Sequence, residues 1–285
     1  MALLEARGLT VTYGGLNAND EIDLECETGK LVGLIGPNGA GKTTFIDAIT
    51  GFTPVTRGYV SFDGVDLGGM RPDARAKLGL VRTFQSLELF EDLTVRDNLL
   101  VAADRPRWYS FLSDLVLPSR GKAAALERID VALNAMDLGD LADKHPSDLS
   151  HGQRKLVGVA RALAADPKLL LLDEPAAGLD TKESQLLGAH LRGFLDLGVS
   201  LFLIDHDMCL VLNVCDYIYV LDFGKVIAHG TPAQVRADPA VIAAYLGESA
   251  GEAQAEAGMA ANRSAEAMAS QSATSRAGAS EAGNE

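Results

Sequence analysis

The sequence predicts an α/β protein with a mostly parallel β-sheet that is flanked by helices and interrupted by a helical insertion. Apolar strand-like runs recur along the chain with helical stretches between them, at residues 31–35, 169–172, 200–204 and 217–221. Residues 91–165 have a helical pattern instead, which is clearest in the amphipathic run 123–136. Strands that alternate with helices are typical of a parallel sheet covered by helices.

The N-terminal part of the chain reads mainly as short strands. Residues 1–35 alternate apolar and polar side chains, with turn signals at Gly14-Gly15 and at residues 27–29. A helix-like segment follows at residues 44–49, and residues 57–67 indicate a hairpin. The predicted order is therefore strands, one helix, a hairpin, the helical insertion and then the remaining strands of the sheet.

The C-terminal stretch, residues 248–285, differs in composition from the rest. It consists mostly of Ala, Ser, Gly and Glu and contains no aromatic residue. Such a segment buries too little apolar area to offset the entropy of ordering it, which predicts a disordered tail. A helix docked on a partner is the alternative, because Ala and Glu favour helix. We expect a folded domain over residues 1–247 and the tail after it.

The hydrophobic content and net charge of the chain limit the classes of function that are compatible with it. The 285 residues include 47% hydrophobic ones, which is ordinary for a globular protein with a core. The net charge of −14 argues against a nucleic-acid partner, which normally meets a basic face. Local basic patches remain compatible with this balance.

Cysteine usage and hydropathy indicate a cytosolic protein that reaches a membrane only through a partner. The three cysteines, Cys26, Cys209 and Cys215, fit neither a disulfide framework nor a Cys-x-x-Cys metal site, so we expect buried reduced thiols. The N-terminus has no signal-peptide pattern. No uncharged apolar run approaches the roughly 20 residues that a membrane span needs.

Residues 36–43 form a complete Gly-x4-Gly-Lys-Thr phosphate loop. It lies between a strand-like run and a helix-like segment, the context that the motif requires; an ordinary glycine-rich turn is the alternative. Its glycines allow backbone N–H groups to point at phosphate oxygens, and the helix N-terminus adds partial positive charge. Lys42 would reach the β- and γ-phosphates, and the Thr43 hydroxyl would complete a Mg²⁺ shell. The predicted nucleotide-binding residues are Gly36, Pro37, Asn38, Gly39, Ala40, Gly41, Lys42, Thr43 and Thr44.

Two adjacent carboxylates, Asp173 and Glu174, end the apolar run 169–172. Neighbouring residues on a strand point to opposite sides, so the two can have different roles. Asp173 can hold Mg²⁺ directly or through water, and Glu174 can polarise the water that attacks the γ-phosphate. The pattern is weak alone but becomes strong downstream of a complete phosphate loop.

Residues 148–155, Asp-Leu-Ser-His-Gly-Gln-Arg-Lys, resemble the Leu-Ser-Gly-Gly-Gln signature of the ABC ATPases. The matching positions are Ser150, His151, Gly152 and Gln153. Ser150 and Gly152 precede a helix, whose N–H groups and dipole form an anion site. His151 departs from the glycine that is commonest there. If the backbone needs a positive φ, histidine is tolerated less well than glycine. His151 could add a phosphate or cross-interface contact, but we favour a tolerated substitution in a working half-site.

The resemblance covers residues 3–247 and implies roles for four further residues. Tyr13 would stack on adenine, although a half-buried strand tyrosine is the alternative. Gln85 would sense Mg²⁺ and the membrane partner, and His206 would contact the γ-phosphate as a catalytic residue beside Glu174 and Gln85. Asp180, in Gly-Leu-Asp at 178–180, would lie in the loop that couples two subunits. Gln85 and His206 would be unremarkable alone, and their order and spacing carry the interpretation.

For the fold, the resemblance implies a P-loop (RecA-like) ABC ATPase core with an antiparallel β subdomain and a helical signature subdomain at about residues 86–165. In this family ATP binds between the phosphate loop of one subunit and the signature of a second, antiparallel subunit. The implied cofactors are therefore ATP and Mg²⁺, and the implied activity is ATP hydrolysis coupled to a cycle of closure and opening.

Longer stretches resemble the ATP-binding subunits of branched-chain amino-acid importers. They are residues 81–85 with 89–90 and 93–95, 173–179, 204–208, and 230–236 running on to 244–248. ATPases of urea or short-amide importers and some lipopolysaccharide exporters share much of this pattern. A soluble ABC ATPase acting on DNA or ribosomes, and a nucleotide-gated switch with little turnover, are further alternatives.

The subfamily implies several partners at the cytoplasmic face of the cell membrane. They are a second ATPase chain, different or identical, two integral membrane permease subunits and, indirectly, an extracytoplasmic substrate-binding protein. Apolar residues after Gln85 would receive a permease helix, or would instead be core: Leu87, Leu89, Phe90 and Leu93. Residues 102–125, with Trp108, would touch lipid headgroups or form a solvated loop.

Overall fold

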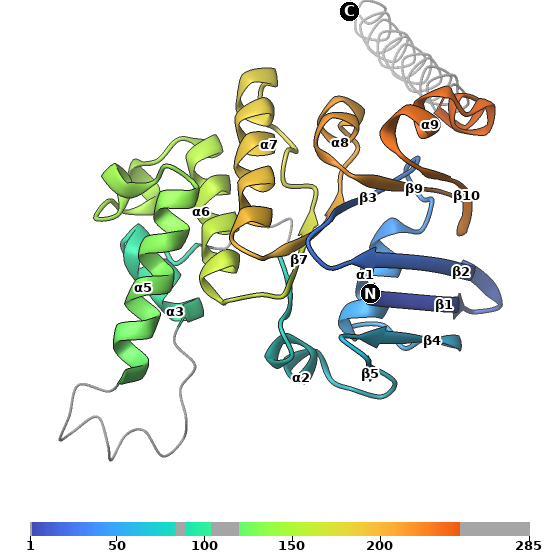
Figure 1. Ribbon diagram of the computed structural model, residues 1–285, viewed down its shortest axis with the longest axis horizontal. Helices are drawn as coiled ribbons and strands as arrows, with labels where there is room; N and C mark the ends of the chain where they lie inside the picture. The colour runs from blue at the N-terminus through green and yellow to red at the C-terminus, as the bar shows by residue number, and fades with distance from the viewer. Residues whose placement is uncertain (1, 84–88, 104–119, 246–285) are drawn as a thin grey trace, which may run out of the picture. The chain divides into compact units, whose positions relative to one another are not determined.

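The computed structural model describes residues 2–83, 89–103 and 120–245 (Figure 1). The expectations for Gln85, Leu87, Trp108 and the tail 248–285 lie outside the described residues. The chain divides into two units, residues 1–241 and 242–285. The boundary predicted at residue 247 stays a prediction.

A six-stranded sheet forms the centre of the first unit, as the alternation of strands and helices predicts. Its order is β10-β9-β3-β8-β7-β6, with bounds Lys225–Gly230, Tyr217–Asp222, Leu31–Ile35, Ser200–Ile204, Leu169–Asp173 and Leu80–Arg82. The pairs from β9 to β6 are parallel, and only β10 is antiparallel to its neighbour. Strands β3, β7 and β8 are buried along their whole length. The predicted α/β fold is confirmed.

A second sheet, antiparallel and four-stranded, comes from the N-terminal part of the chain. Its order is β2-β1-β4-β5, with bounds Leu16–Glu27, Ala2–Tyr13, Arg57–Phe62 and Val65–Asp66. Helix α1 (Lys42–Thr50) packs between the two sheets, and its Phe45 ring lies 6.1 Å from that of Phe202 on β8. One continuous core therefore joins both sheets and α1, the helix that carries the phosphate loop (Figure 1).

A group of helices is inserted between β6 and β7, which are neighbours in the sheet. It contains α3 (Val95–Ala103), α5 (Arg120–Ala135), the short helices η1 (Gly139–Leu141) and η2 (Pro146–Asp148), and α6 (His151–Ala164). Figure 1 shows α3, α5 and α6 packed together on one side of the parallel sheet, with the antiparallel sheet on the other. The expected helical insertion therefore leaves and re-enters the sheet at adjacent strands.

The remaining helices are α2 (Pro72–Lys77), α7 (Thr181–Asp196), α8 (Met208–Val214) and α9 (Pro232–Ala237). Among the described residues, every helix is too short or too polar to cross a lipid bilayer. Cys26 and Cys215 are buried as expected, but Cys209 is exposed, and the expectation for it was wrong. Cys209 lies on the outer face of α8. The next two residues, Leu210 and Val211, are buried on its inner face.

Candidate nucleotide-binding and catalytic site

The phosphate loop links β3 to α1, and two of its glycines are required by close packing. A Cβ on Gly36 would lie 2.0 Å from the carbonyl oxygen of Leu221. Gly41, whose φ is 102°, would place a Cβ 2.5 Å from the carbonyl oxygen of Ala18. No side chain fits at such distances, so the loop can run against β2 and β9 only with glycine at these positions.

Neighbouring segments hold the loop through its carbonyl groups. The backbone N–H of Gly224, in the β9–β10 turn, donates to Ala40 O at 2.9 Å. The Asn19 side chain on β2 donates to Gly41 O at 3.1 Å. Sequence reasoning missed both residues; the Asp-Phe-Gly-Lys turn was the available signal for Gly224, and Asn19 had none. Both sheets therefore brace the loop before any nucleotide binds.

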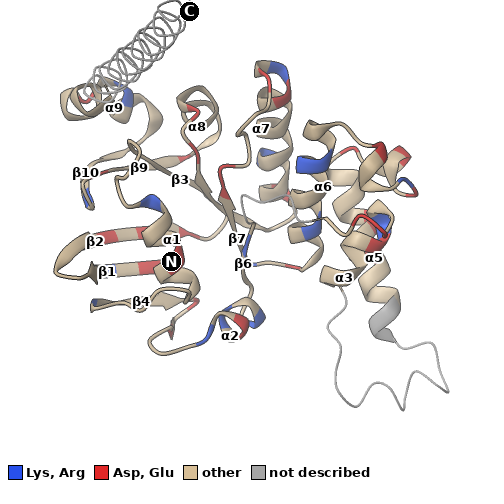
Figure 2. Cartoon of the chain, turned by 180° about the vertical axis from the view of Figure 1, so that it is seen from behind, with Lys and Arg blue, Asp and Glu red and all other residues tan. Residues whose placement is uncertain are grey.

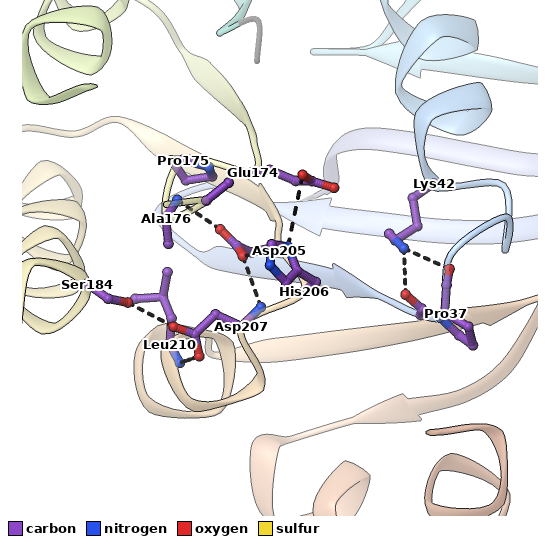
Figure 3. Close-up of polar contacts among 12 residues, drawn as sticks. Pro37, Lys42, Glu174, Pro175, Ala176, Ser184, Asp205, His206, Asp207 and Leu210 are labelled. Atoms are coloured by element: carbon purple, nitrogen blue, oxygen red, sulfur yellow. Dashed lines mark hydrogen bonds and ion pairs between the residues drawn. The ribbon is translucent and has the colours of Figure 1, made fainter. Parts of the chain in front are cut away.

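The Lys42 side chain is buried and folds back over the loop. Its Nζ donates to Gly36 O at 2.5 Å and to Pro37 O at 2.9 Å (Figure 3). Thr43, the next residue, is exposed. The loop thus presents an ammonium group and an accessible hydroxyl, which suit phosphate oxygens and a hard cation respectively.

Asp173 ends the buried strand β7 and is itself only 5% exposed. Its Oδ2 accepts a hydrogen bond from Arg82 at 2.8 Å, and its backbone N–H donates to the Thr83 hydroxyl at 3.2 Å. Within the described residues, no group of three Asp, Glu, His or Cys side chains could hold a metal alone. Mg²⁺ often takes one or two protein oxygens and completes its shell with phosphate and water, so Thr43 and Asp173 fit it when ATP is present.

Glu174 and His206 lie together, at the ends of the adjacent strands β7 and β8. Glu174 Oε2 is 4.0 Å from His206 Nδ1 (Figure 3). Glu174 has a φ of 48°, uncommon for this residue, and its N–H donates to Ile204 O at 2.7 Å. Such backbone strain occurs most often at functional sites, where the surrounding structure maintains it. The His206 side chain is 61% exposed and therefore open to a ligand.

A fully buried carboxylate, Asp205, holds the turn that carries His206. Its Oδ2 accepts from the Ala176 N–H at 3.0 Å, and its Oδ1 accepts from the Asp207 N–H at 2.9 Å (Figure 3). Asp207 in turn caps α8 by accepting from the Leu210 N–H at 3.0 Å. Sequence reasoning assigned no role to Asp205 or Asp207, because only the tertiary structure brings residue 176 to residue 205.

The signature residues open α6. Ser150 is its N-cap, and a capping box with Gln153 joins the two residues by bonds of 3.2 and 2.9 Å. A Cβ on Gly152 would lie 2.4 Å from Glu183 Oε1, so a side chain there would displace the Glu183 carboxylate at the start of α7. Asp180 is the N-cap of α7, in a second capping box with Glu183. The N-termini of α6 and α7 are therefore packed side by side.

His151 is the first residue of α6 and is exposed. It is absent from the described non-glycine residues that have positive φ, so its departure from glycine causes no backbone strain. Its Nε2 is 3.4 Å from where a Gly178 Cβ would lie, which places the ring beside the loop that ends in Asp180.

A buried lysine that sequence reasoning missed links α6 to the segment after Glu174. Lys155 Nζ donates to Ala177 O and, at 3.4 Å, to Pro175 O. Burial lowers its pKa, while the charges of Asp205 and Glu174 oppose that shift. Lys155 also lines a cavity of about 230 Å³ together with Arg82, Asp173 and Glu174. The cavity therefore lies between the carboxylates and the signature helix.

Tyr13, at the end of β1, is 52% exposed and bonded through its hydroxyl to Thr53 Oγ1 at 3.1 Å. Its ring is therefore available for stacking, and adenine contact stays a prediction. Of the residues expected to receive a permease helix, Leu89 is buried and lines the cavity, whereas Phe90 is 49% exposed. The described part of that segment is thus partly core and partly surface.

Two family models match the chain. The ABC transporter model matches residues 19–177, which is more than half of the chain. The model of the branched-chain amino acid ATP-binding cassette transporter matches residues 225–251.

Individual proteins are similar over most of their length. The high-affinity branched-chain amino acid transport ATP-binding protein BraF of Pseudomonas aeruginosa is 40% identical over 86% of this chain and 98% of its own. The protein of the same description in Escherichia coli, LivG, is 41% identical with the same coverage. The crystal structure of the ADP conformation of MJ1267, an ATP-binding cassette of an ABC transporter, is 31% identical with a TM-score of 0.76, covering 87% of this chain and 100% of that one.

Proposed function

This chain belongs to the ABC transporter family of ATP-hydrolysing proteins, and from that premise we propose that it powers a membrane importer of branched-chain amino acids. Support for this substrate class comes from the C-terminal match over residues 225–251 and from the similarity to BraF and LivG. An ATPase subunit does not itself touch the transported molecule, so the substrate follows from its relatives and not from its site.

The observation that carries the catalytic proposal is the placement of Asp173, Glu174 and His206 at the ends of β7 and β8. Parallel strands bring their carboxyl ends to one edge of the sheet, where the phosphate loop also emerges from β3. Glu174 would orient the attacking water and accept its proton, with His206 beside it and near the γ-phosphate. Lys42 would donate hydrogen bonds to phosphate oxygens in place of those that it donates to the carbonyl oxygens of Gly36 and Pro37.

Mg²⁺ would be held by Thr43 and Asp173, with Gln85 as a further ligand, and would neutralise charge on the β- and γ-phosphates. Tyr13 would stack on the adenine ring, since its ring is exposed at the end of β1. The remaining loop residues, from Gly36 to Thr44, would surround the phosphates with N–H groups.

The signature, Ser150 to Gln153, of which Ser150 and His151 are exposed, would close over ATP held by a second ATPase chain, with Asp180 at the same interface. That chain is different in the arrangement that we favour, and two permease subunits would hold the pair at the cytoplasmic face of the membrane. A substrate-binding protein outside would deliver the amino acid.

Uptake by cells that lack this chain tests the proposal. Labelled leucine, isoleucine, valine and urea would be supplied, with cells complemented by the intact chain or by Lys42→Ala. We expect branched-chain uptake to fall and only the intact chain to restore it. Loss of urea uptake alone would move the substrate to short amides. Unchanged uptake of all four, in cells without a second copy of the system, would contradict the import role.

A further inference from the structure

Arg82, the last residue of β6, lies between two carboxylates from different parts of the chain. One of its terminal nitrogens donates to Asp173 Oδ2 at 2.8 Å and the other to Asp47 Oδ1, on α1, at 2.5 Å. The side chain of Arg82 is 8% exposed and that of Asp173 is 5% exposed, while that of Asp47 is 30% exposed. Figure 2 shows the basic end of β6 beside β7.

The geometry requires a guanidinium group. Its planar fork carries several donors in fixed directions and can hold two carboxylates at once, whereas a lysine ammonium is a single point charge on a flexible stem. The neighbouring Thr83 hydroxyl accepts from the Asp173 N–H. The end of β6 therefore holds both the backbone and the carboxylate of Asp173.

A carboxylate as buried as that of Asp173 needs a positive partner, because an unpaired buried charge is strongly destabilising. Two cations can supply that charge: the Arg82 guanidinium, which the structure shows, and the Mg²⁺ that arrives with ATP. We propose that Arg82 is a positioning residue that neutralises Asp173 in the metal-free site and thereby sets how tightly the site takes up Mg²⁺. This inference rests on the proposed metal role of Asp173.

The proposal predicts effects of opposite sign on folding and on metal binding. Without the guanidinium, Asp173 is unpaired in the metal-free protein but still compensated when Mg²⁺ is present. The metal-free protein should therefore lose stability, while the apparent affinity for Mg²⁺ should rise. A purely structural role for Arg82 predicts that the variant loses both stability and affinity for Mg²⁺.

Arg82→Met in the full chain tests this, with Arg75→Met as the matched control. Arg75 is also a buried arginine, but within the described residues its side chain donates hydrogen bonds only to backbone carbonyls, those of Met70, Ala48, Ile49 and Leu67. Melting temperature would be measured while Mg²⁺ is titrated at a fixed concentration of a non-hydrolysable ATP analogue. Both variants should melt lower by about 10 °C without metal. Only Arg82→Met should regain its melting temperature as Mg²⁺ is added. Its half-saturation should occur at a roughly fivefold lower Mg²⁺ concentration than that of the unmodified chain.

Two further variants separate charge from geometry. Arg82→Lys keeps the charge and loses the fork, so it should melt lower yet keep Mg²⁺ half-saturation near that of the unmodified chain. Asp47→Asn removes the competing negative charge from a partly exposed position and so strengthens the ion pair between Arg82 and Asp173. The Mg²⁺ concentration at half-saturation should therefore rise by about twofold. This second variant keeps the test available even if Arg82→Met does not fold.

The inference is overturned if Arg82→Met leaves the Mg²⁺ half-saturation unchanged or raises it, or if Arg75→Met shows the same metal-dependent recovery. Asp173→Asn separates the metal role of Asp173 from the role of Arg82. If Asp173→Asn leaves Mg²⁺ binding unchanged, the metal role of Asp173 fails and this inference fails with it. If Asp173→Asn weakens Mg²⁺ binding while Arg82→Met has no effect, only the role of Arg82 is wrong.

Discussion

The phosphate-loop end of the site and its signature end are built in different ways. At the first, the functional groups of Lys42 and Asp173 are buried and already bonded to carbonyls and to Arg82. At the second, the caps of two neighbouring helices, Ser150 and Asp180, are exposed, and so is His151, the first residue of α6. One chain therefore has a phosphate-loop half whose functional groups are buried and already bonded, and a signature half whose functional groups are exposed. In the function proposed above, the buried phosphate-loop half would bind nucleotide within one chain, whereas the exposed signature half would act on nucleotide held by a partner chain.

Replacement of Glu174 by Gln should have the largest effect on this contrast. Loss of a general base typically costs 10²–10⁴-fold in rate, so we expect ATP hydrolysis to fall by about 10³-fold. ATP binding should persist, because Lys42 and the loop are untouched. Phosphate release and equilibrium ATP binding measure the two effects. Unchanged turnover would remove Glu174 from the base role.

The buried thiol of Cys26 should make stability depend on pH. Burial raises its pKa from 9.0 to about 12, so the folded state keeps the proton after the unfolded state has lost it. The resulting stability is complete below pH 9.0 and is lost as pH rises from there towards 12. Cys26→Ala should reduce the slope of unfolding free energy against pH by up to about 1.4 kcal/mol per pH unit.

Denaturant unfolding between pH 8 and 11 measures this slope. Cys209→Ala is the control for loss of a thiol, because Cys209 is exposed. Equal slopes in the unmodified chain and in Cys26→Ala would contradict the assignment of the pH dependence to this thiol.

Ser150→Ala tests the signature end. The hydroxyl of Ser150 caps α6 by accepting from the Gln153 N–H at 3.2 Å, and loss of such a cap costs about 1 kcal/mol of unfolding free energy. ATP binding by the single chain should be unchanged, since the phosphate loop lies elsewhere. ATP-driven association with the partner ATPase should weaken. Weaker ATP binding by the isolated variant would break the division between the two halves.

His151→Gly should have the smallest effect. Because His151 has no positive φ, glycine relieves no strain and its greater flexibility costs up to about 1 kcal/mol. We expect stability to fall slightly and hydrolysis in the assembled transporter to change by less than about threefold, by an energy comparable to one surface contact. A variant more stable than the unmodified chain would show that His151 is strained after all.

Much of this architecture followed from local patterns. The phosphate loop, the Asp173-Glu174 pair and the apolar strands each have a signal within a few neighbouring residues, so the α/β fold and the nucleotide could be predicted. Buried supports could not be found in this way. Arg82 and Lys155 look like ordinary charged residues in the sequence, and their roles depend on partners at Asp47, Asp173 and Ala177.

The expectation of buried thiols was confirmed for Cys26 and Cys215 but was wrong for Cys209, for a related reason. Cys209 and Cys215 lie at the two ends of the short helix α8, and only the packing of that helix decides that one faces solvent and the other the sheet. A seven-residue helix has too few positions for its sequence pattern to define a buried face.

The sequence by itself determined that this protein binds a nucleoside triphosphate, because the phosphate loop and its strand–loop–helix context encode that chemistry locally. The preference for ATP and its hydrolysis followed from the resemblance to the ABC ATPases. The tertiary structure alone decided which carboxylate meets which cation. Strands β6, β7 and β8 are far apart in the chain, and parallel pairing places Arg82, Asp173, Glu174 and His206 at one edge of the sheet. Burial at that edge makes each charge depend on its neighbour, a dependence that no local pattern records.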